Sequence, residues 1–194
     1  MKGNIQDSEI LKLKKKKPEE AFSKLMTQYR DQVFLICRRV TDDKFDAEDL
    51  AQDVFIRIWR ALDAFRGDSA LSTWIYRIAW NVCASYLSSK KKASMFSSYD
   101  ESESDDEQTS ISHSIGSCDR SFEDMEQQQL IETVFKNLSE THRLVLTLFY
   151  LKEQNYEEIC SITGMPMGTL KATLHRAKEK MRYEVTKELS KSTR

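Results

Sequence analysis

The stretch NYEEICSITGMPMGTLKATLHRAKEKMR, residues 155–182, decides how the C-terminal part of the chain folds. Its apolar spacing predicts a short helix over residues 156–163. Gly164 stands where a turn needs a left-handed residue, and Pro166 suits the first turn of a second helix. Two helices joined by a short turn with a central glycine form the helix-turn-helix pattern.

The second predicted helix has two chemically different faces. Its apolar face consists of Leu170, Leu174, Ala177 and Met181, which fall in one sector at about 100° per residue. The opposite face holds small and basic residues, among which Lys171 and Arg176 can read guanine or hold phosphates. Residues 166–194 contain eight Lys or Arg and three Glu, a local net charge of +5. We therefore predict DNA binding here; the alternative is a solvated helix face.

Upstream, residues 46–65 read DAEDLAQDVFIRIWRALDAF and predict an amphipathic helix. The face opposite its apolar stripe carries an isoleucine among charged and polar residues, namely Asp49, Gln52, Asp53, Ile56 and Arg60. An apolar anchor ringed by charges is typical of a protein-docking face. A single exposed apolar residue is also ordinary on a protein surface, so both interpretations remain open.

The next segment, residues 65–81, reads FRGDSALSTWIYRIAWN. It places aromatic side chains beside basic ones, a combination that suits single-stranded nucleic acid because unstacked bases can lie on aromatic rings. For Trp74 and Ile78, which are four residues apart, we favour a place in the hydrophobic core. The polar loop from Arg66 to Ser72 is not explained by a core role.

Composition limits the fold class. The 194 residues include 40% hydrophobic and 31% charged residues but only 5 Gly and 2 Pro, which favours helices over tightly turned β-structure. We predict an all-α protein with two small helical domains joined by a flexible acidic linker. The predicted segments are a disordered basic leader (1–17), a first domain (18–92), the linker (93–125) and a second domain with the helix-turn-helix (126–190). Pro18 is expected to open the first helix and Asp46 to cap the second.

The sequence predicts no enzymatic activity, no metal site and no cofactor. None of the four cysteines lies in a CxxC motif or near clustered histidines. We find no nucleophile motif and no glycine loop that could cradle a phosphate. No signal peptide or membrane-spanning stretch is predicted, and we expect a cytoplasmic protein without membrane insertion.

Together these motifs resemble bacterial sigma factors of the extracytoplasmic-function type. The resemblance covers about residues 18–92 and 126–188 and rests on three strings in the family's order: DAEDLAQDVFIRIW, FRGDSALSTWIYRIAWN and YEEIC…GMPMGTLKATLHRAKEKM. It implies a region 2 domain, a region 4 domain, and a protein that directs core RNA polymerase to promoters and promotes melting of the DNA.

The resemblance also implies roles for individual residues. The clamp helices of the polymerase largest subunit would be bound by Asp49, Gln52, Asp53 and Ile56. The open strand of the minus-ten element, with one flipped base, would be held by Arg66, Asp68, Ser69, Ser72, Arg77, Trp80 and Asn81. The minus-thirty-five element and its phosphates would be contacted by Thr169, Lys171, Ala172, His175, Arg176 and Lys178.

The implied partners are the polymerase clamp and flap, promoter DNA and an anti-sigma protein. The acidic linker would thread the channel that later holds nascent RNA. Three residues depart from common family choices: Thr173 where a basic residue is frequent, Ala172 where Ser is frequent, and Trp80 where a polar residue is common. These departures bear on the DNA letters that the protein prefers.

A conventional helix-turn-helix regulator is the alternative function. Such a protein would form a homodimer on palindromic sites and would not need the polymerase for DNA binding. The sigma-factor interpretation instead predicts a monomer that gains promoter affinity only with core polymerase.

Overall fold

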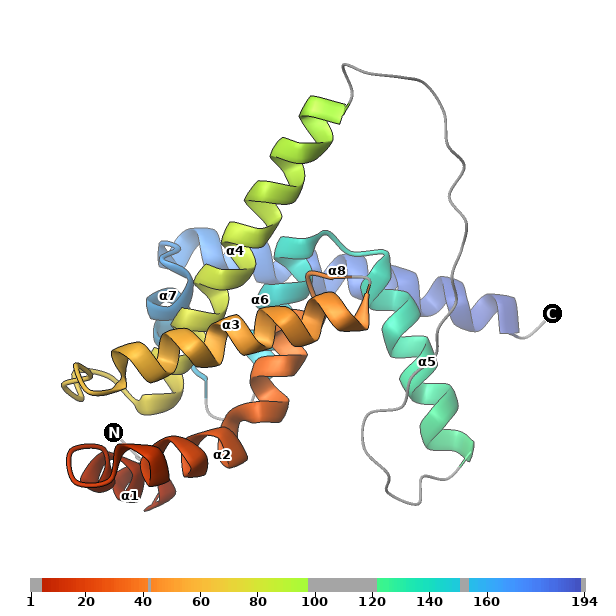
Figure 1. The fold of residues 1–194 in the computed structure, drawn as a ribbon. Helices are drawn as coiled ribbons and strands as arrows, with labels where there is room; N and C mark the ends of the chain where they lie inside the picture. Colours follow the sequence, from red (N-terminus) through yellow and green to blue (C-terminus); the bar gives the residue numbers. More distant parts are fainter. Residues whose placement is uncertain (1–4, 42, 98–121, 151–153, 193–194) are drawn as a thin grey trace.

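The computed structural model describes residues 5–41, 43–97, 122–150 and 154–192. Within these ranges the chain is helical and contains no strand, which confirms the all-α prediction. The eight described helices are α1 (Ile5–Leu13), α2 (Pro18–Arg38), α3 (Lys44–Leu62), α4 (Leu71–Ser97), α5 (Phe122–Lys136), α6 (Glu140–Tyr150), α7 (Tyr156–Thr163) and α8 (Met167–Ser192). In Figure 1, α8 runs behind α6, and the C-terminal half of α4 projects beyond the other helices.

The N-terminal segment is folded, so the prediction of a disordered leader is wrong for the described residues 5–17. Helix α1 packs on α2 through Ile10, which is 1% exposed. Burial of such a side chain contributes about 2 kcal/mol. The Asp7 carboxylate is buried beside it and accepts hydrogen bonds from Gln28 Nε2 and the Tyr29 hydroxyl, both at 2.8 Å. These contacts offset the entropy lost on ordering the segment.

Helices α2 and α3 begin at sequence signals, with one correction. Pro18 stands in the first turn of α2, as predicted. Helix α3 is capped by Asp43, whose carboxylate accepts hydrogen bonds from the backbone N–H groups of Phe45 (2.6 Å) and Asp46 (3.2 Å). The predicted cap, Asp46, instead lies inside the first turn. Asp43 caps because its backbone is extended while the residues after it are helical.

Helix α4 is longer than the sequence patterns indicate. The helix continues to Ser97, beyond residue 92 where the first domain is predicted to end, and α5 begins at Phe122. Both ends of the predicted linker (93–125) are therefore helical, whereas residues 98–121 lie outside the described residues. The C-terminal part of α4 includes exposed lysines at 90–92, which are good helix formers but leave no apolar periodicity to detect.

Helices α7 and α8 form the predicted helix-turn-helix. Asn155 and Glu158 make a capping box at the start of α7, with hydrogen bonds of 2.9 and 2.8 Å. Gly164 ends α7 with a φ of 73°, the left-handed conformation that favours glycine. Of the predicted apolar face of α8, Leu170, Leu174 and Ala177 are buried and Met181 is half-buried; Ile159 and Ile162 of α7 are buried as well.

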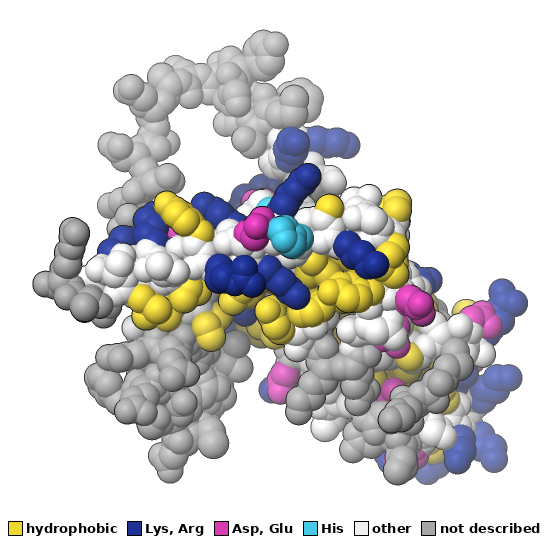
Figure 2. Space-filling view, turned by 180° about the vertical axis from the view of Figure 1, so that it is seen from behind, with side chains coloured by type: hydrophobic (Ala, Val, Ile, Leu, Met, Phe, Trp, Pro, Cys, Tyr) yellow, Lys and Arg dark blue, Asp and Glu magenta, His cyan; other side chains and the backbone are white. Residues whose placement is uncertain are grey.

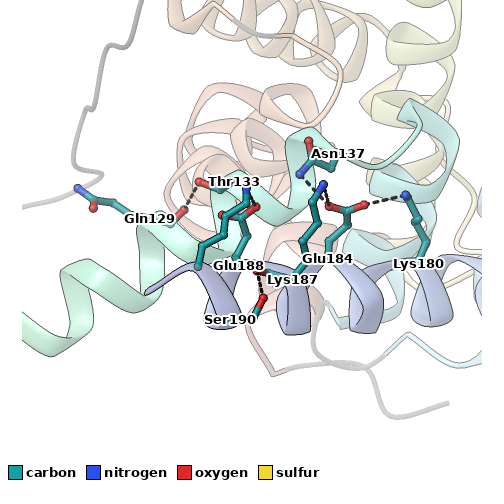
Figure 3. A network of polar contacts seen from close by, with 9 residues as sticks. Gln129, Thr133, Asn137, Lys180, Glu184, Lys187, Glu188 and Ser190 are labelled. Atoms are coloured by element: carbon teal, nitrogen blue, oxygen red, sulfur yellow. Dashed lines mark hydrogen bonds and ion pairs between the residues drawn. The ribbon is translucent and has the colours of Figure 1, made fainter. Parts of the chain in front are cut away.

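A buried carboxylate holds the second half of α8 against α5. Glu184 is 3% exposed and accepts hydrogen bonds from Asn137 Nδ2 at 3.0 Å and from Lys180 Nζ at 2.7 Å (Figure 3). The hydrogen bond from the Lys180 ammonium holds the pKa of Glu184 below its ordinary value. The carboxylate therefore remains charged and fixes the direction of α8 relative to α5.

The N-terminal helices α1–α4 and the C-terminal helices α5–α8 pack against each other. Their buried apolar side chains belong to one continuous cluster, with α4 against α7 and α2 against α6. At this junction the Arg39 guanidinium lies 4.1 Å from the centroid of the Phe135 ring. Burial lowers the pKa of Arg39 to about 10. The two sets of helices are thus in direct contact.

Candidate nucleic-acid and protein interfaces

The outer face of α8 is open to solvent over its N-terminal half. Five of the predicted site residues on this helix are exposed, namely Thr169, Lys171, Ala172, His175 and Arg176. Figure 2 shows basic side chains and a histidine gathered over this helix, next to a band of hydrophobic side chains. His175 Nδ1 lies 3.3 Å from the Glu179 carboxylate one turn further along. Small and basic side chains on one helix face suit insertion into a major groove.

Lys178, the sixth predicted residue on α8, is placed differently. Its side chain is half-buried, and its ammonium lies 3.7 Å from the centroid of the Phe149 ring of α6. This is a cation–π contact, which ties the charge to the packing of α8 on α6. Lys178 therefore does not share the open arrangement of Lys171 and Arg176.

The loop between α3 and α4 carries polar side chains and is anchored by aromatic residues packed beneath it. The Phe65 ring is buried and lies 4.9 Å from the ring of Trp74, which confirms the core position expected for this tryptophan. Gly67 turns the chain with a φ of 84°, a conformation that side chains rarely adopt. The predicted loop residues are exposed or half-buried: Arg66, Asp68 and Ser69.

On α4, two predicted residues already have partners in the C-terminal part of the chain, one in α7 and one just before it. Arg77 Nε donates a 2.9 Å hydrogen bond to the Ser161 carbonyl oxygen in α7, and its guanidinium also donates to the Ser161 hydroxyl. The carbonyl of Ser161 is in the last turn of α7, where no intrahelical donor is present. Ser72 accepts a hydrogen bond from Gln154 Nε2 at 3.5 Å. The structure thus brings the first half of α4 against α7.

Further along α4, the surface is open again. Asn81 is exposed and Trp80 is half-buried against the core. From Asn81 a groove of about 500 Å³ continues along α4 and is lined by Asn81, Ala84, Ser85, Ser88, Ser89 and Lys92. Tyr76, by contrast, is buried with its ring 6.1 Å from that of Tyr29, so it offers no aromatic surface for stacking a base.

The predicted docking face on α3 is largely exposed. Asp49 and Gln52 are exposed, and Ile56 is 48% exposed although it is apolar. Asp53 is half-buried and forms an ion pair with Arg57, one turn away, at 2.9 Å. The face therefore combines an apolar side chain with carboxylates that have different degrees of exposure.

Sequence reasoning missed two aromatic residues on the same helix. Phe45 is 75% exposed and Trp59 is 43% exposed. Phe45 precedes Asp49 by four residues and Ile56 by eleven, a spacing that puts all three on one helix face. Extending the helix by one turn towards its N-terminus would have revealed Phe45. Trp59 also contacts the Phe22 ring at 5.1 Å, so part of it belongs to the core.

Within the described ranges, no group of three His, Cys, Asp or Glu side chains is arranged to hold a metal ion. None of the described helices is long and apolar enough to cross a membrane.

Two family models match the chain over the helices that carry these faces. Sigma-70 region 2 matches residues 25–93, and Sigma-70 region 4 matches residues 128–181. The first range covers most of α2, all of α3 and most of α4, and the second runs from α5 to the middle of α8. The fold and its exposed faces therefore define a two-region protein of the sigma-70 class.

Relatives that align with nearly the whole chain show which kind of sigma-70 protein it is. The ECF RNA polymerase sigma-E factor of Escherichia coli strain K12 is 32% identical over 180 residues, which cover 92% of this chain and 94% of the relative. The RNA polymerase sigma-H factor of Pseudomonas aeruginosa is 31% identical over 177 residues, with 90% and 91% coverage. The chain belongs to the extracytoplasmic-function (ECF) family of RNA polymerase sigma factors.

Solved structures share the fold. CnrH in complex with the cytosolic domain of CnrY aligns with a TM-score of 0.62 at 18% identity, covering 92% of this chain and 96% of that one. The sigma factor RpoE in complex with the anti-sigma factor NepR from Bartonella quintana aligns with a TM-score of 0.63 at 22% identity, covering 85% and 96%. The two-part helical arrangement is therefore shared with proteins of quite different sequence.

Proposed function

We propose that this sigma factor binds core RNA polymerase through α3, recognises the minus-ten element through α4 and the loop before it, and recognises the minus-thirty-five element through α8. The observation that carries the proposal is the presence of three exposed faces of different chemistry on one chain. The first is the face of α3, which combines carboxylates with exposed apolar side chains. The second is the polar loop between α3 and α4, which lies over the buried ring of Phe65. The third is the basic outer face of α8. A regulator that needs no polymerase would leave the first face without a role.

The polymerase contact is assigned to Asp49, Gln52, Asp53 and Ile56, with Phe45 as an addition. An exposed apolar pair flanking polar residues is the usual composition of a binding hot spot and its rim. The Arg57 partner holds the Asp53 carboxylate in a fixed position on this face. The carboxylates favour a basic surface on the polymerase.

The minus-ten contact is assigned to the residues around the α3–α4 loop and along α4: Arg66, Asp68, Ser69, Ser72, Arg77, Trp80 and Asn81. Capture of one flipped base by this polar loop would offset the cost of unpairing, which is a few kcal/mol. Opening would then be driven by selective binding of the open strand, so we propose that the protein itself performs no covalent chemistry.

The minus-thirty-five contact is assigned to Thr169, Lys171, Ala172, His175, Arg176 and Lys178. Arg176 and Lys171 would read guanine edges or hold phosphates, and Ala172 would contact a thymine methyl group. Thr169 lies in the first turn of α8, where the helix N-terminus also favours phosphate. Lys178 would add positive charge at the edge of this contact.

The contact between α4 and α7 adds a step to this function. Arg77 is bonded to Ser161 of α7 and Ser72 to Gln154 just before α7, so α7 must leave α4 before both side chains can hold a DNA strand. Binding of the polymerase to the two helical units would supply the free energy for this separation. We place the protein in the cytoplasm, where the polymerase works, and propose an anti-sigma protein as a further partner.

The test is association with core polymerase followed by transcription. Purified chain should elute as a monomer, co-elute with core enzyme, and redirect that enzyme to new start sites on genomic DNA. Ile56→Arg should abolish co-elution, whereas Leu189→Arg, which charges a similarly exposed apolar residue near the end of α8, should not. A stable homodimer that binds palindromic DNA without the polymerase would contradict the proposal.

A further inference from the structure

Lys14 lies just after α1, outside residues 25–93 that the region 2 model matches. Its ammonium reaches the C-terminal end of α3, 48 to 51 residues away in the sequence. There it donates hydrogen bonds to the carbonyl oxygens of Leu62 at 3.5 Å, of Asp63 at 3.3 Å, and of Phe65. The same ammonium lies 5.7 Å from the centroid of the Phe65 ring. One side chain thus binds three carbonyl groups within the four residues that follow the path of the chain out of α3.

The end of α3 is a favourable place for such a donor, and the Leu62 carbonyl oxygen also accepts a 3.2 Å hydrogen bond from the Phe65 N–H. The last carbonyl groups of a helix have no intrahelical partner and carry the negative end of the helix dipole. Helix α3 ends at Leu62 without a left-handed glycine, since the residue after it, Asp63, has ordinary helical angles (φ −64°, ψ −37°). A lysine ammonium can take the place of that motif by bonding the carbonyls directly.

The backbone of Lys14 is held in place by the rest of the N-terminal segment. Its N–H donates a 3.0 Å hydrogen bond to the Ile10 carbonyl, and Ile10 is buried in the core. The Asp7 carboxylate anchors the same helix to α2. An ion pair of 2.6 Å between Glu9 and Lys24 adds a second link to α2. The Lys14 side chain therefore extends from a backbone that is held in place by the packing of α1 on α2.

The residues that Lys14 binds lead directly into the loop assigned to the minus-ten element. Phe65 is buried beneath this loop against Trp74. The next residues, Arg66 to Ser69, carry the exposed polar groups proposed to surround a flipped base. A shift in the path of residues 63–65 would displace these groups, because they follow Phe65 directly in the chain.

We propose that Lys14 is a positioning residue for the promoter-reading loop at residues 65–70, an inference that rests on the proposed function of this loop. Lys14 acts through the backbone of Leu62 to Phe65 and does not itself contact DNA. Among the lysines of residues 12–17, Lys14 thus has a structural contact and the others face solvent. Lys12, Lys15, Lys16 and Lys17 are exposed, and Lys17 pairs locally with Glu20 at 2.9 Å.

The decisive variants are Lys14→Met, which keeps the length but removes the charge and the donors, and Lys14→Arg, which restores both. Lys15→Met is the matched control because it removes an exposed charge from the neighbouring position. Hydrogen exchange of the purified chain should show faster exchange in residues 63–70 for Lys14→Met only. Protection of α2 and of the middle of α3 should stay as in the unmodified protein.

The functional measurement uses holoenzyme and a forked promoter fragment whose minus-ten non-template strand is unpaired, taken from a promoter mapped by transcription. Lys14→Met should weaken binding to the fork about 5- to 10-fold, the effect expected from losing a typical intramolecular hydrogen bond. Its affinity for core polymerase should be unchanged. Lys14→Arg and Lys15→Met should bind the fork like the unmodified protein.

A second readout separates positioning from a general loss of stability. Fork fragments with single abasic sites should reveal one position where loss of the base costs the unmodified holoenzyme most. For Lys14→Met this penalty should shrink, because the loop no longer holds that base. If Lys14→Met keeps both the fork affinity and the full abasic penalty, the inference about Lys14 is wrong while the function stands. If the unmodified holoenzyme itself does not bind the fork, the proposed function fails and this inference fails with it.

Discussion

The two helices proposed to read promoter DNA, α4 and α8, present their side chains in different states. On α8, the outward-facing residues from Thr169 to Arg176 are exposed, and the contact found for them within the described residues is a local one, between His175 and Glu179. Figure 2 shows this face of the molecule. On α4, Arg77 is bonded to Ser161 of α7 and Ser72 to Gln154 just before α7, 84 and 82 residues away in the sequence. The proposed DNA-binding face of α8 is open to solvent, whereas part of the proposed face of α4 is covered by residues of the same chain.

This difference assigns an order to promoter recognition. The face on α8 can meet duplex DNA without rearrangement, whereas α4 can hold an open strand with all its residues only after α7 moves. Separating α4 from α7 breaks surface hydrogen bonds, each contributing roughly 1 kcal/mol or less, and also parts the apolar side chains that pack between the two helices. We propose that binding of the polymerase supplies the free energy for both. The predictions that follow test this contrast, from the largest expected effect to the smallest.

Arg176→Ala removes the longest basic side chain from the open face of α8. Promoter binding by the holoenzyme should fall by about 10- to 100-fold, since a bidentate contact to guanine contributes about 1–3 kcal/mol. Binding to core polymerase should not change. The measurement is promoter affinity at fixed salt, with Arg182→Ala as a control that removes an exposed charge further along α8. Equal losses in both variants would indicate a general charge effect.

Two substitutions of opposite charge at Ser161 should change the accessibility of the α4 face in opposite directions. Ser161→Lys places a like charge beside Arg77 and should loosen the contact between α4 and α7. Ser161→Asp places an opposite charge there and should tighten it. We expect the chain without polymerase to bind a single-stranded minus-ten oligonucleotide about fivefold better and about fivefold worse, respectively, which corresponds to about 1 kcal/mol for one exposed pair.

The control for the Ser161 pair is the other reading face in the same molecules. Holoenzymes formed with Ser161→Lys, Ser161→Asp and the unmodified chain should bind minus-thirty-five duplex DNA with the same affinity, because Ser161 is not on the outer face of α8. If both substitutions change single-strand binding in the same direction, the Arg77 contact does not control access to α4.

The smallest expected effect is that of Glu184→Gln, which should change the free energy of unfolding in a pH-dependent way. The pKa of Glu184 lies below the ordinary value of 4.5 because of the hydrogen bond from Lys180. The charged carboxylate therefore stabilises the fold above about pH 4.5, and this stabilisation is lost as the pH falls through the lowered pKa. In urea unfolding, Glu184→Gln should be less stable than the unmodified chain at neutral pH, and the difference should close in acid.

The matched control for that series is Glu188→Gln, which removes a carboxylate that pairs with Lys191 near the end of α8. It should change the free energy of unfolding little at any pH. A Glu184→Gln difference that persists unchanged in acid would mean that the network in Figure 3 acts through packing and not through charge.

The parts of the fold that the sequence predicted correctly are those set by local patterns. The helix-turn-helix follows from the left-handed Gly164 and from an apolar face with helical period, both contained within 28 residues. The start of α2 follows from Pro18 and the acids after it. Periodicity also separated the exposed face of α8 from its buried one, because that helix packs on one side only.

The parts that were missed depend on contacts between distant segments. Helix α1 is fixed by Asp7 bonding to Tyr29, and Lys14 bonds to carbonyls of the α3 end, neither of which leaves a periodic trace. The bond from Arg77 to Ser161 joins two helices whose pairing no local pattern encodes. The exposed Phe45 was overlooked because the N-cap of α3 was predicted at Asp46 instead of Asp43.

The most direct test of the account is permanganate mapping of unpaired thymines on a promoter fragment, with the chain alone, core polymerase alone, and both together. We predict that only the mixture makes thymines of the minus-ten element reactive. The chain alone should leave the duplex closed, because its α4 face is partly occupied and it lacks the polymerase. Reactive thymines with the chain alone, or none in the mixture on any promoter to which the mixture binds, would contradict the account.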